Sequence, residues 1–134
     1  MQKIRITTSN RQELVDITRS VEEIVRDASV GSGVCVVYCP HTTGAITINE
    51  GADPDVASDI VSGLGRLIPG SWDFKHMEGN SDAHLKASLI GPSETVIIDG
   101  GRLVLGAWQK IFFCEFDGPR ERSIRIFIQS GDLP

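Results

Sequence analysis

The chain has 134 residues, 40% of them hydrophobic and 23% charged, which is typical of one soluble globular domain spanning residues 1–134. Thirteen Lys and Arg against eighteen Asp and Glu give a net charge of −5, and this balance argues against nucleic acid or a membrane surface as a partner. No apolar run is long enough to cross a bilayer and no apolar signal core is present, so we expect a cytoplasmic protein whose three cysteines are reduced.

The N-terminal part predicts two strands followed by a helix. Alternating apolar residues indicate strands over 3–7 and 13–17, and the polar turn between them indicates that they pair as a hairpin. The helix starts from a cap at Thr18 or Ser20, where Ser20 begins a capping-box motif, and it ends at the glycines that start with Gly31.

The middle of the chain predicts two more strands and two helices. A continuous β-branched run over 34–38 predicts a central strand, and the alternating residues 45–49 predict its neighbour. The residues between them, 39–44, form a polar corner. Asp53–Pro54 places an acceptor at the N-cap and proline at the first helical position, which predicts the start of a second helix. A third, short helix is predicted over 83–90.

The C-terminal part is rich in predicted strands, at 95–99, 103–105, 110–116 and 123–129. Together with the helical segments and the short turns, these strands predict an α+β fold. We expect a mostly antiparallel sheet or a barrel-like sandwich, covered by two to three helices.

All three histidines lie in polar segments between predicted core elements, at His41, His76 and His84. A lone histidine is more often structural than functional, but three in connecting segments favour one convergent site. Three neutral imidazoles are also a common ligand set for zinc or another transition metal ion, although their spacing matches no diagnostic metal motif. Glu78 lies two residues from His76, which suits either an acid/base partner or a group that orients the imidazole.

Arg120 and Arg122 follow a predicted turn between two strands, where guanidinium groups could capture phosphate. A solvated hairpin turn is the alternative, because Glu121 partly neutralises the two charges. Other chemistries are disfavoured, since the chain has no Walker loop, Rossmann glycine motif or Gly-x-Ser-x-Gly elbow. His76-Met-Glu begins like a zinc deaminase motif, but that motif needs a Cys-x-x-Cys pair and only Cys114 follows.

Three segments in the same order resemble the YjbQ family, often described as secondary thiamine-phosphate synthases: 41–56, 79–89 and 105–122. The first begins His-Thr-Thr-Gly, the second begins Gly-Asn-Ser-Asp-Ala-His, and the third contains Gly-Ala-Trp-Gln and Phe-Asp-Gly-Pro-Arg-Glu-Arg. The family usually has Gly-Thr-Trp-Gln in the third segment, so Ala107 removes a hydroxyl here.

The resemblance implies a small α+β protein that assembles as a homotrimer, with a pocket near the subunit boundaries. The implied reaction joins a pyrimidine methyl diphosphate to a thiazole phosphate and releases pyrophosphate. Imidazoles, an arginine and a divalent ion (zinc, another transition metal, or magnesium with the substrate) suit such a leaving group. The alternative is a non-catalytic homotrimeric module that binds a metal or a small anion.

Carried over residue by residue, the resemblance also implies roles within this pocket. The catalytic roles fall to Glu78, His41 and Asn80. The metal ligands are His41, His76 and His84. The small phosphorylated molecule is bound by Arg120, Asn49, Trp108 and Gln109.

Overall fold

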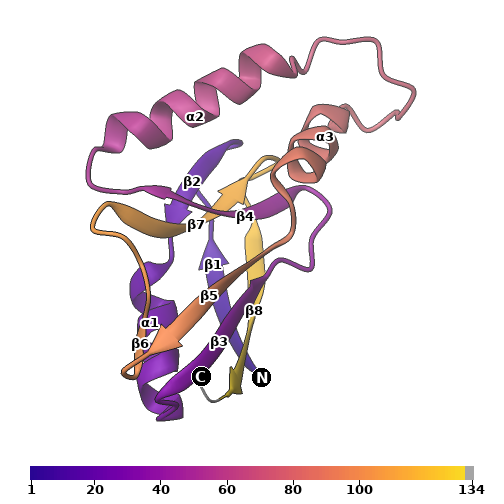
Figure 1. Cartoon of the computed structure of the whole chain (residues 1–134). Helices are drawn as coiled ribbons and strands as arrows, with labels where there is room; N and C mark the ends of the chain where they lie inside the picture. Colours follow the sequence, from indigo (N-terminus) through magenta and orange to yellow (C-terminus); the bar gives the residue numbers. More distant parts are fainter. Residues whose placement is uncertain (132–134) are drawn as a thin grey trace.

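Alternating apolar residues build the larger of two antiparallel sheets, which has five strands in the order β1-β8-β3-β5-β6 (Figure 1). The structure is a computed structural model and describes residues 1–131. In the central strand, Cys35 and Val37 turn inward and are fully buried. The strands of this sheet are β1 (Gln2–Thr7), β3 (Ser32–Tyr38), β5 (Ser93–Asp99), β6 (Arg102–Leu103) and β8 (Glu121–Ser130).

The second sheet has three antiparallel strands in the order β2-β7-β4. Ile46, Ile111 and Phe113 from this sheet share one buried cluster with the inner residues of the larger sheet. Removing these apolar side chains from water holds the two sheets face to face. The strands are β2 (Glu13–Asp16), β4 (Gly44–Glu50) and β7 (Gln109–Glu115).

Three helices complete residues 1–131: α1 (Thr18–Ala28), α2 (Pro54–Leu67) and α3 (Ser81–Ile90). The first helix buries Val21 in the core between the sheets. Figure 1 shows α2 and α3 on the other side of the three-stranded sheet, away from the larger sheet. There Ala83 of α3 packs against Phe116 in a second, smaller core. The three-stranded sheet is therefore covered on both faces.

The predicted α+β class is confirmed, because the described helices cover antiparallel sheets, but the strand partners differ from prediction. β1 pairs with β8 and β2 pairs with β7, so the predicted N-terminal hairpin is wrong. β4 also pairs with β7 and does not lie beside β3. The reason is that β1 and β3 contribute to one side of the core while β2 and β4 contribute to the other, so each of these consecutive pairs is divided between the two sheets.

The ends of α1 also differ from prediction. The backbone N of Thr18 donates to Asp16 Oδ1 at 2.9 Å, so the capping oxygen comes from Asp16 and Ser20 lies inside the helix. The helix ends at Ser29, whose φ of 54° is left-handed, before Gly31 is reached. The second helix begins as predicted, because Asp53 Oδ1 accepts a hydrogen bond from the backbone N of Asp55 at 2.9 Å.

The three cysteines are free and buried, in agreement with the expected thiols. Within residues 1–131, every helix is too short or too polar to cross a membrane.

A buried charged cluster attaches α3 to the loop between β1 and β2. Asp82 and Lys86, one turn apart on α3, are only 1% and 2% exposed. The guanidinium of Arg11 donates to Asp82 at 2.9 and 3.2 Å, and Lys86 Nζ donates to it at 3.1 Å. Lys86 also donates to Gln12 Oε1 at 3.0 Å. Burial alone would raise the pKa of Asp82, but the hydrogen bonds and charges of Arg11 and Lys86 outweigh it and hold this pKa at about 2.

The Asp82→Asn variant should lose about 3 kcal/mol of folding free energy at neutral pH, because the Lys86 ammonium stays buried without its anion. Since folding lowers the pKa of Asp82, its contribution is complete above the unfolded value of about 4 and is lost as the pH falls toward about 2. Urea denaturation of both proteins across this range measures the difference, which should shrink in acid. Asp59→Asn, exposed on α2, is the matched control. Equal urea midpoints for Asp82→Asn and the parent would contradict the prediction.

Candidate functional site

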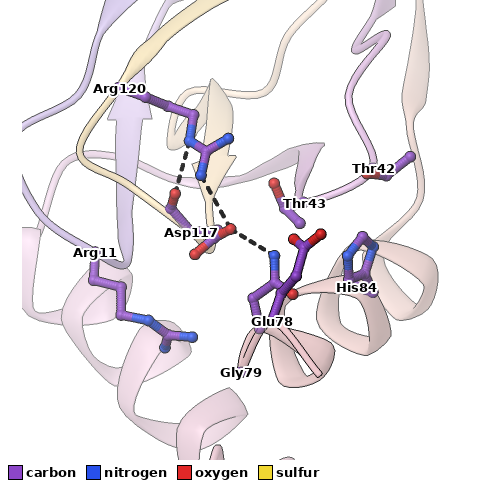
Figure 2. Close-up of a pocket in the computed structure, with 9 residues that line it drawn as sticks. Arg11, Thr42, Thr43, Glu78, Gly79, His84, Asp117 and Arg120 are labelled. Carbon is purple, nitrogen blue, oxygen red and sulfur yellow. Dashed lines mark hydrogen bonds and ion pairs between the residues drawn. The ribbon is translucent and has the colours of Figure 1, made fainter. Parts of the chain in front are cut away.

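A polar cavity of about 540 Å³ opens where four irregular segments meet (Figure 2). One segment joins β1 to β2, the second joins β3 to β4, the third precedes α3, and the fourth is the turn from β7 to β8. Figure 2 shows the Glu78 carboxylate between Asp117 and the imidazole of His84. The lining residues are Arg11, Thr42, Thr43, Glu78, Gly79, Asn80, His84, Asp117 and Arg120.

Asp117 orients the two predicted site residues Arg120 and Asn80. The Arg120 guanidinium donates to the Asp117 carbonyl oxygen at 2.9 Å and to its Oδ2 at 3.1 Å. Asn80 Nδ2 donates to the same Oδ2 at 2.8 Å. These bonds leave Asn80 Oδ1 buried and without a hydrogen-bond partner among the described residues. Asn80 lines the cavity, and its buried Oδ1 needs a hydrogen-bond donor that these residues do not supply.

The turn that carries Arg120 is held against the loop after β1. The backbone N of Thr8 donates to the Arg120 carbonyl at 3.0 Å, and the Arg120 N donates to Thr8 Oγ1 at 2.9 Å. Gly118 N donates to the Arg11 carbonyl at 2.8 Å, and a Cβ at Gly118 would collide with the carbonyl of Asn10. Only glycine permits this close approach, which brings Arg11 and Arg120 to one cavity.

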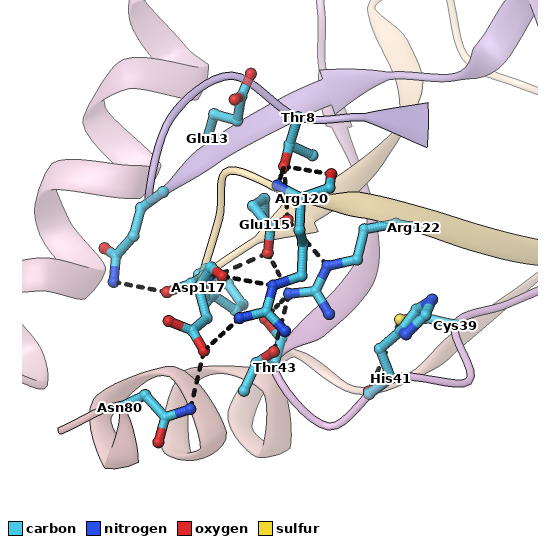
Figure 3. A network of polar contacts seen from close by, with 12 residues as sticks. Thr8, Glu13, Cys39, His41, Thr43, Asn80, Glu115, Asp117, Arg120 and Arg122 are labelled. Atoms are coloured by element: carbon cyan, nitrogen blue, oxygen red, sulfur yellow. Dashed lines mark hydrogen bonds and ion pairs between the residues drawn. The ribbon is translucent and has the colours of Figure 1, made fainter. Parts of the chain in front are cut away.

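An ion pair between Arg122 and Glu115 lies buried behind the cavity (Figure 3). Arg122 Nε donates to Glu115 Oε1 at 2.9 Å, and Nη2 donates to Oε2 of the same carboxylate. The Thr8 hydroxyl donates to Glu115 Oε1 at 2.8 Å. Burial alone would raise the pKa of Glu115, but these hydrogen bonds and the Arg122 charge lower it. Arg122 Nη2 also donates to Thr43 Oγ1 at 2.8 Å, so the pair fixes one wall of the cavity.

The His41 side chain binds the backbone of β8 just beyond the point where the pairing of β3 with β8 ends. The β3–β8 register, continued past Tyr38, would place Pro40 opposite Ser123. Proline has no N–H, and the His41 imidazole takes this place, with Nε2 3.0 Å from the Ser123 N and 3.1 Å from its O. Burial lowers the pKa of His41, and the charge of Arg122 lowers it further. In Figure 3, His41 lies on the opposite side of the network from the Asn80 side of the cavity.

His76 and His84 do lie together, with ring centroids 5.5 Å apart and nearly perpendicular planes. His76 Nε2 is 3.7 Å from Glu78 Oε2. Within residues 1–131, no three His, Cys, Asp or Glu side chains are arranged to hold a metal ion. One chain thus forms the predicted three-histidine site only in part, because His41 lines a different cavity and is held by Ser123.

Within one chain, Asn49, Trp108 and Gln109 lie away from this cavity, so a single subunit does not bring these three predicted site residues beside Arg120. The pairing of β4 with β7 runs from Gly44, near the cavity, to Glu50 opposite Gln109 at the far end. There Asn49 Oδ1 accepts from the next backbone N at 2.7 Å, and Gln109 Oε1 accepts from the N of residue 106 at 2.8 Å. Both side chains bind nearby backbone groups, and Trp108 is 65% exposed.

Sequence reasoning missed three residues that shape the cavity. Arg11 lies in a loop with no distinctive pattern, and Asp117 was visible only as part of a turn. Thr43 stands inside the His-Thr-Thr-Gly motif, so its place in the family pattern was a usable signal. Long-range contacts position all three, and no local spacing reveals such contacts.

The sequence model of the family described as UPF0047 protein YjbQ-like matches residues 2–131. The chain belongs to the YjbQ family. A UPF0047 protein of Methanocaldococcus jannaschii is 53% identical over 126 residues, which cover 94% of this chain and 91% of that protein. The UPF0047 protein YugU of Bacillus subtilis is 48% identical over 127 residues, which cover 94% of this chain and 96% of YugU.

Crystal structures of YjbQ-family proteins share this fold. A family member from Clostridium acetobutylicum superposes with a TM-score of 0.95 at 50% identity, covering 96% of this chain and 100% of that one. A YbjQ-like protein of unknown function from Sulfolobus solfataricus superposes with a TM-score of 0.94 at 36% identity, covering 97% and 96%. The resemblance to the YjbQ family and the fold class that it implies are therefore confirmed.

Proposed function

We propose that the cavity between Arg120 and His84 binds a small phosphorylated molecule. The observation that carries this proposal is the pairing of two guanidinium groups, Arg11 and Arg120, with a buried orphan acceptor, Asn80 Oδ1. Guanidinium groups bind phosphate oxygens through two parallel N–H donors, and the acceptor needs an N–H or O–H from the same ligand. A ligand with a phosphate at one end and a polar donor at the other satisfies both.

The reaction that we propose for this site is of the thiamine-phosphate synthase type. The ring nitrogen of the thiazole phosphate forms a bond to the pyrimidine methylene carbon with its lone pair, the bond from that carbon to the diphosphate oxygen breaks, and pyrophosphate leaves with the electron pair of the broken bond. Arg120 would stabilise the charge that grows on this leaving group. Asn80 would orient the ligand through its free oxygen, and Glu78 would accept or donate a proton at the cavity mouth.

A non-catalytic module that binds a metal or a small anion is the second candidate. The Glu78 side chain is 73% exposed, so the cavity does not withdraw this carboxylate from water. Both arginines also already face carboxylates, since Arg11 pairs with Asp82 and Arg120 with Asp117. Such a site suits reversible binding as well as it suits catalysis.

A divalent ion, zinc or another transition metal, is part of this proposal. His76 and His84 would hold it with two imidazole nitrogens, and the phosphate oxygens of the ligand supply further donors. Magnesium would accompany the diphosphate instead if the ion enters with the substrate. Bound there, the ion would neutralise phosphate charge.

His84 and His41 should differ in what their alanine variants lose: bound zinc in the first case and folding stability in the second. His84→Ala should lose bound zinc and keep its stability, because it removes one of two neighbouring imidazoles. His41→Ala should keep the zinc and lose about 1–3 kcal/mol of folding free energy, because Ser123 is left without its side-chain partner. Elemental analysis and urea denaturation of both variants test this, and equal zinc content in the two would contradict it.

We also propose that the protein assembles as a homotrimer. Tyr38, Ile97 and Phe127 project from three neighbouring strands of the large sheet and are 44%, 53% and 48% exposed. Exposed large apolar side chains on one sheet face are typical of a subunit interface. Light scattering should report three chain masses, and Phe127→Glu should lower that mass while Leu67→Glu, exposed on α2, leaves it unchanged. A monomeric parent protein at micromolar concentration would contradict the proposal.

Arg120→Lys should weaken pyrophosphate binding by about tenfold, because it keeps the charge but loses the planar fork of donors. Calorimetry of the whole protein measures this, and Arg19→Lys, on the exposed surface of α1, is the matched control. Unchanged affinity in Arg120→Lys would show that the cavity does not bind anions.

The parallel Glu78→Gln variant should retain pyrophosphate affinity and lose turnover of the pyrimidine and thiazole phosphates. If the parent protein shows no turnover, the binding module is the correct function.

A further inference from the structure

A second, smaller cavity lies where the edge strand β1 pairs with β8, on the outer face of the large sheet. Its volume is about 230 Å³, and segment 41–43 separates it from the first cavity, since His41 lines one and Thr43 the other. It uses none of the residues in the proposed function. Its polar lining consists of Lys3, Arg5, Thr7, His41, Glu121 and Ser123, with the buried Arg122 behind them.

Positive charge accumulates on this part of an acidic protein. Lys3 and Arg5 both point outward from β1, because Ile4 and Ile6 between and beside them are buried. The register places Lys3 directly opposite Arg125 of β8, and like charges in such positions repel each other. Within residues 1–131, neither Lys3, Arg5 nor Arg125 forms an ion pair. Bound negative charge would relieve this repulsion.

The Ser123 hydroxyl is a second, independent feature of the cavity. Its Oγ is buried and has no hydrogen-bond partner among the described residues. His41 Nε2 lies within hydrogen-bond distance of the backbone N and O of Ser123, and its tautomer decides whether it accepts from the N or donates to the O. Ser123 lies directly opposite Arg5 in the register. The free hydroxyl thus belongs to a cavity that Arg5 and His41 also line, and an anionic oxygen bound there can accept its hydrogen bond.

We propose that this second cavity binds a phosphate group, either inorganic phosphate or the end of a phosphate monoester. Arg5 would donate its planar pair of N–H groups to two phosphate oxygens, Lys3 would supply a point charge, and Ser123 Oγ would donate to a further oxygen. The cavity, at about 230 Å³, has room for a phosphoryl group and for part of an attached organic group. Glu121 opposes binding, because its carboxylate lines the same cavity.

Inorganic phosphate is the direct probe, added to the whole protein and followed by calorimetry. Arg5→Gln should weaken phosphate binding at this site by about tenfold, and Ser123→Ala by about threefold. Arg19→Gln, an exposed arginine of α1, is the charge-matched control and should have no effect. In nuclear magnetic resonance titrations, phosphate should shift the Ser123 amide signal in the parent protein and in Arg120→Lys at the same concentrations, whereas Arg5→Gln should need about tenfold more phosphate for the same shift.

Glu121→Gln provides a test in the opposite direction. Removing the opposing carboxylate should tighten phosphate binding by about threefold, a gain that a damaged fold cannot produce. The proposal is overturned if Arg5→Gln binds phosphate like the parent, or if the Ser123 amide does not respond. It is also overturned if Arg120→Lys alone abolishes binding, because the phosphate then belongs to the first cavity. These outcomes therefore test phosphate binding in the second cavity independently of ligand binding in the first.

Discussion

The buried ion pair between Arg122 and Glu115 is the interaction on which the arrangement of both cavities depends. Its two charges come from different sheets, since Arg122 lies in β8 and Glu115 ends β7. Both carboxylate oxygens accept two hydrogen bonds, because Thr8 donates to one and the Asp117 N donates to the other, in addition to Arg122. A buried pair with this many partners adds little net stability, but it is costly to break.

The value of the pair lies in the geometry that it imposes. Arg122 reaches past the carboxylate to both oxygen atoms of Thr43, so the start of β4 is held against β8. The Thr8 hydroxyl, fixed by Glu115, also accepts from the backbone N of Arg120. The pair therefore positions residues on three segments that carry the first cavity. A smaller apolar residue at either position would leave its partner charge unpaired and these segments unsupported.

Most elements of the fold could be predicted from periodicity, whereas their partners could not. The β-branched run of β3 and the Asp53–Pro54 start of α2 are local signals, and both agree with the structure. The pairing of β1 with β8 depends on contacts between opposite ends of the chain, so no local pattern reveals it. Glu115 shows the same limit, because it stands at the end of an apolar strand and its burial depends on a distant arginine.

The sequence predicted which residue types the candidate site contains, but not which of those residues lie together in space. Family motifs correctly brought His84, Asn80 and Arg120 to one cavity. They also suggested His41, although a ring that satisfies the backbone of Ser123 has a structural task. A sequence shows that an imidazole follows Pro40, but it does not show which strand lacks a partner there. That information exists only once the β3–β8 register is known.

The corner over residues 39–44 explains why two cavities lie so close together. β3 belongs to the large sheet and β4 to the small one, so the chain must pass from one layer to the other within this corner. Pro40 ends the pairing with β8, and the next side chains then turn to different sides: His41 faces the outer sheet surface, whereas Thr43 faces the cavity beside α3. Because Arg122 lines the outer cavity and binds Thr43, one buried guanidinium supports both walls. A change in the corner would therefore reach both cavities, even though each has its own charged residues for ligand binding.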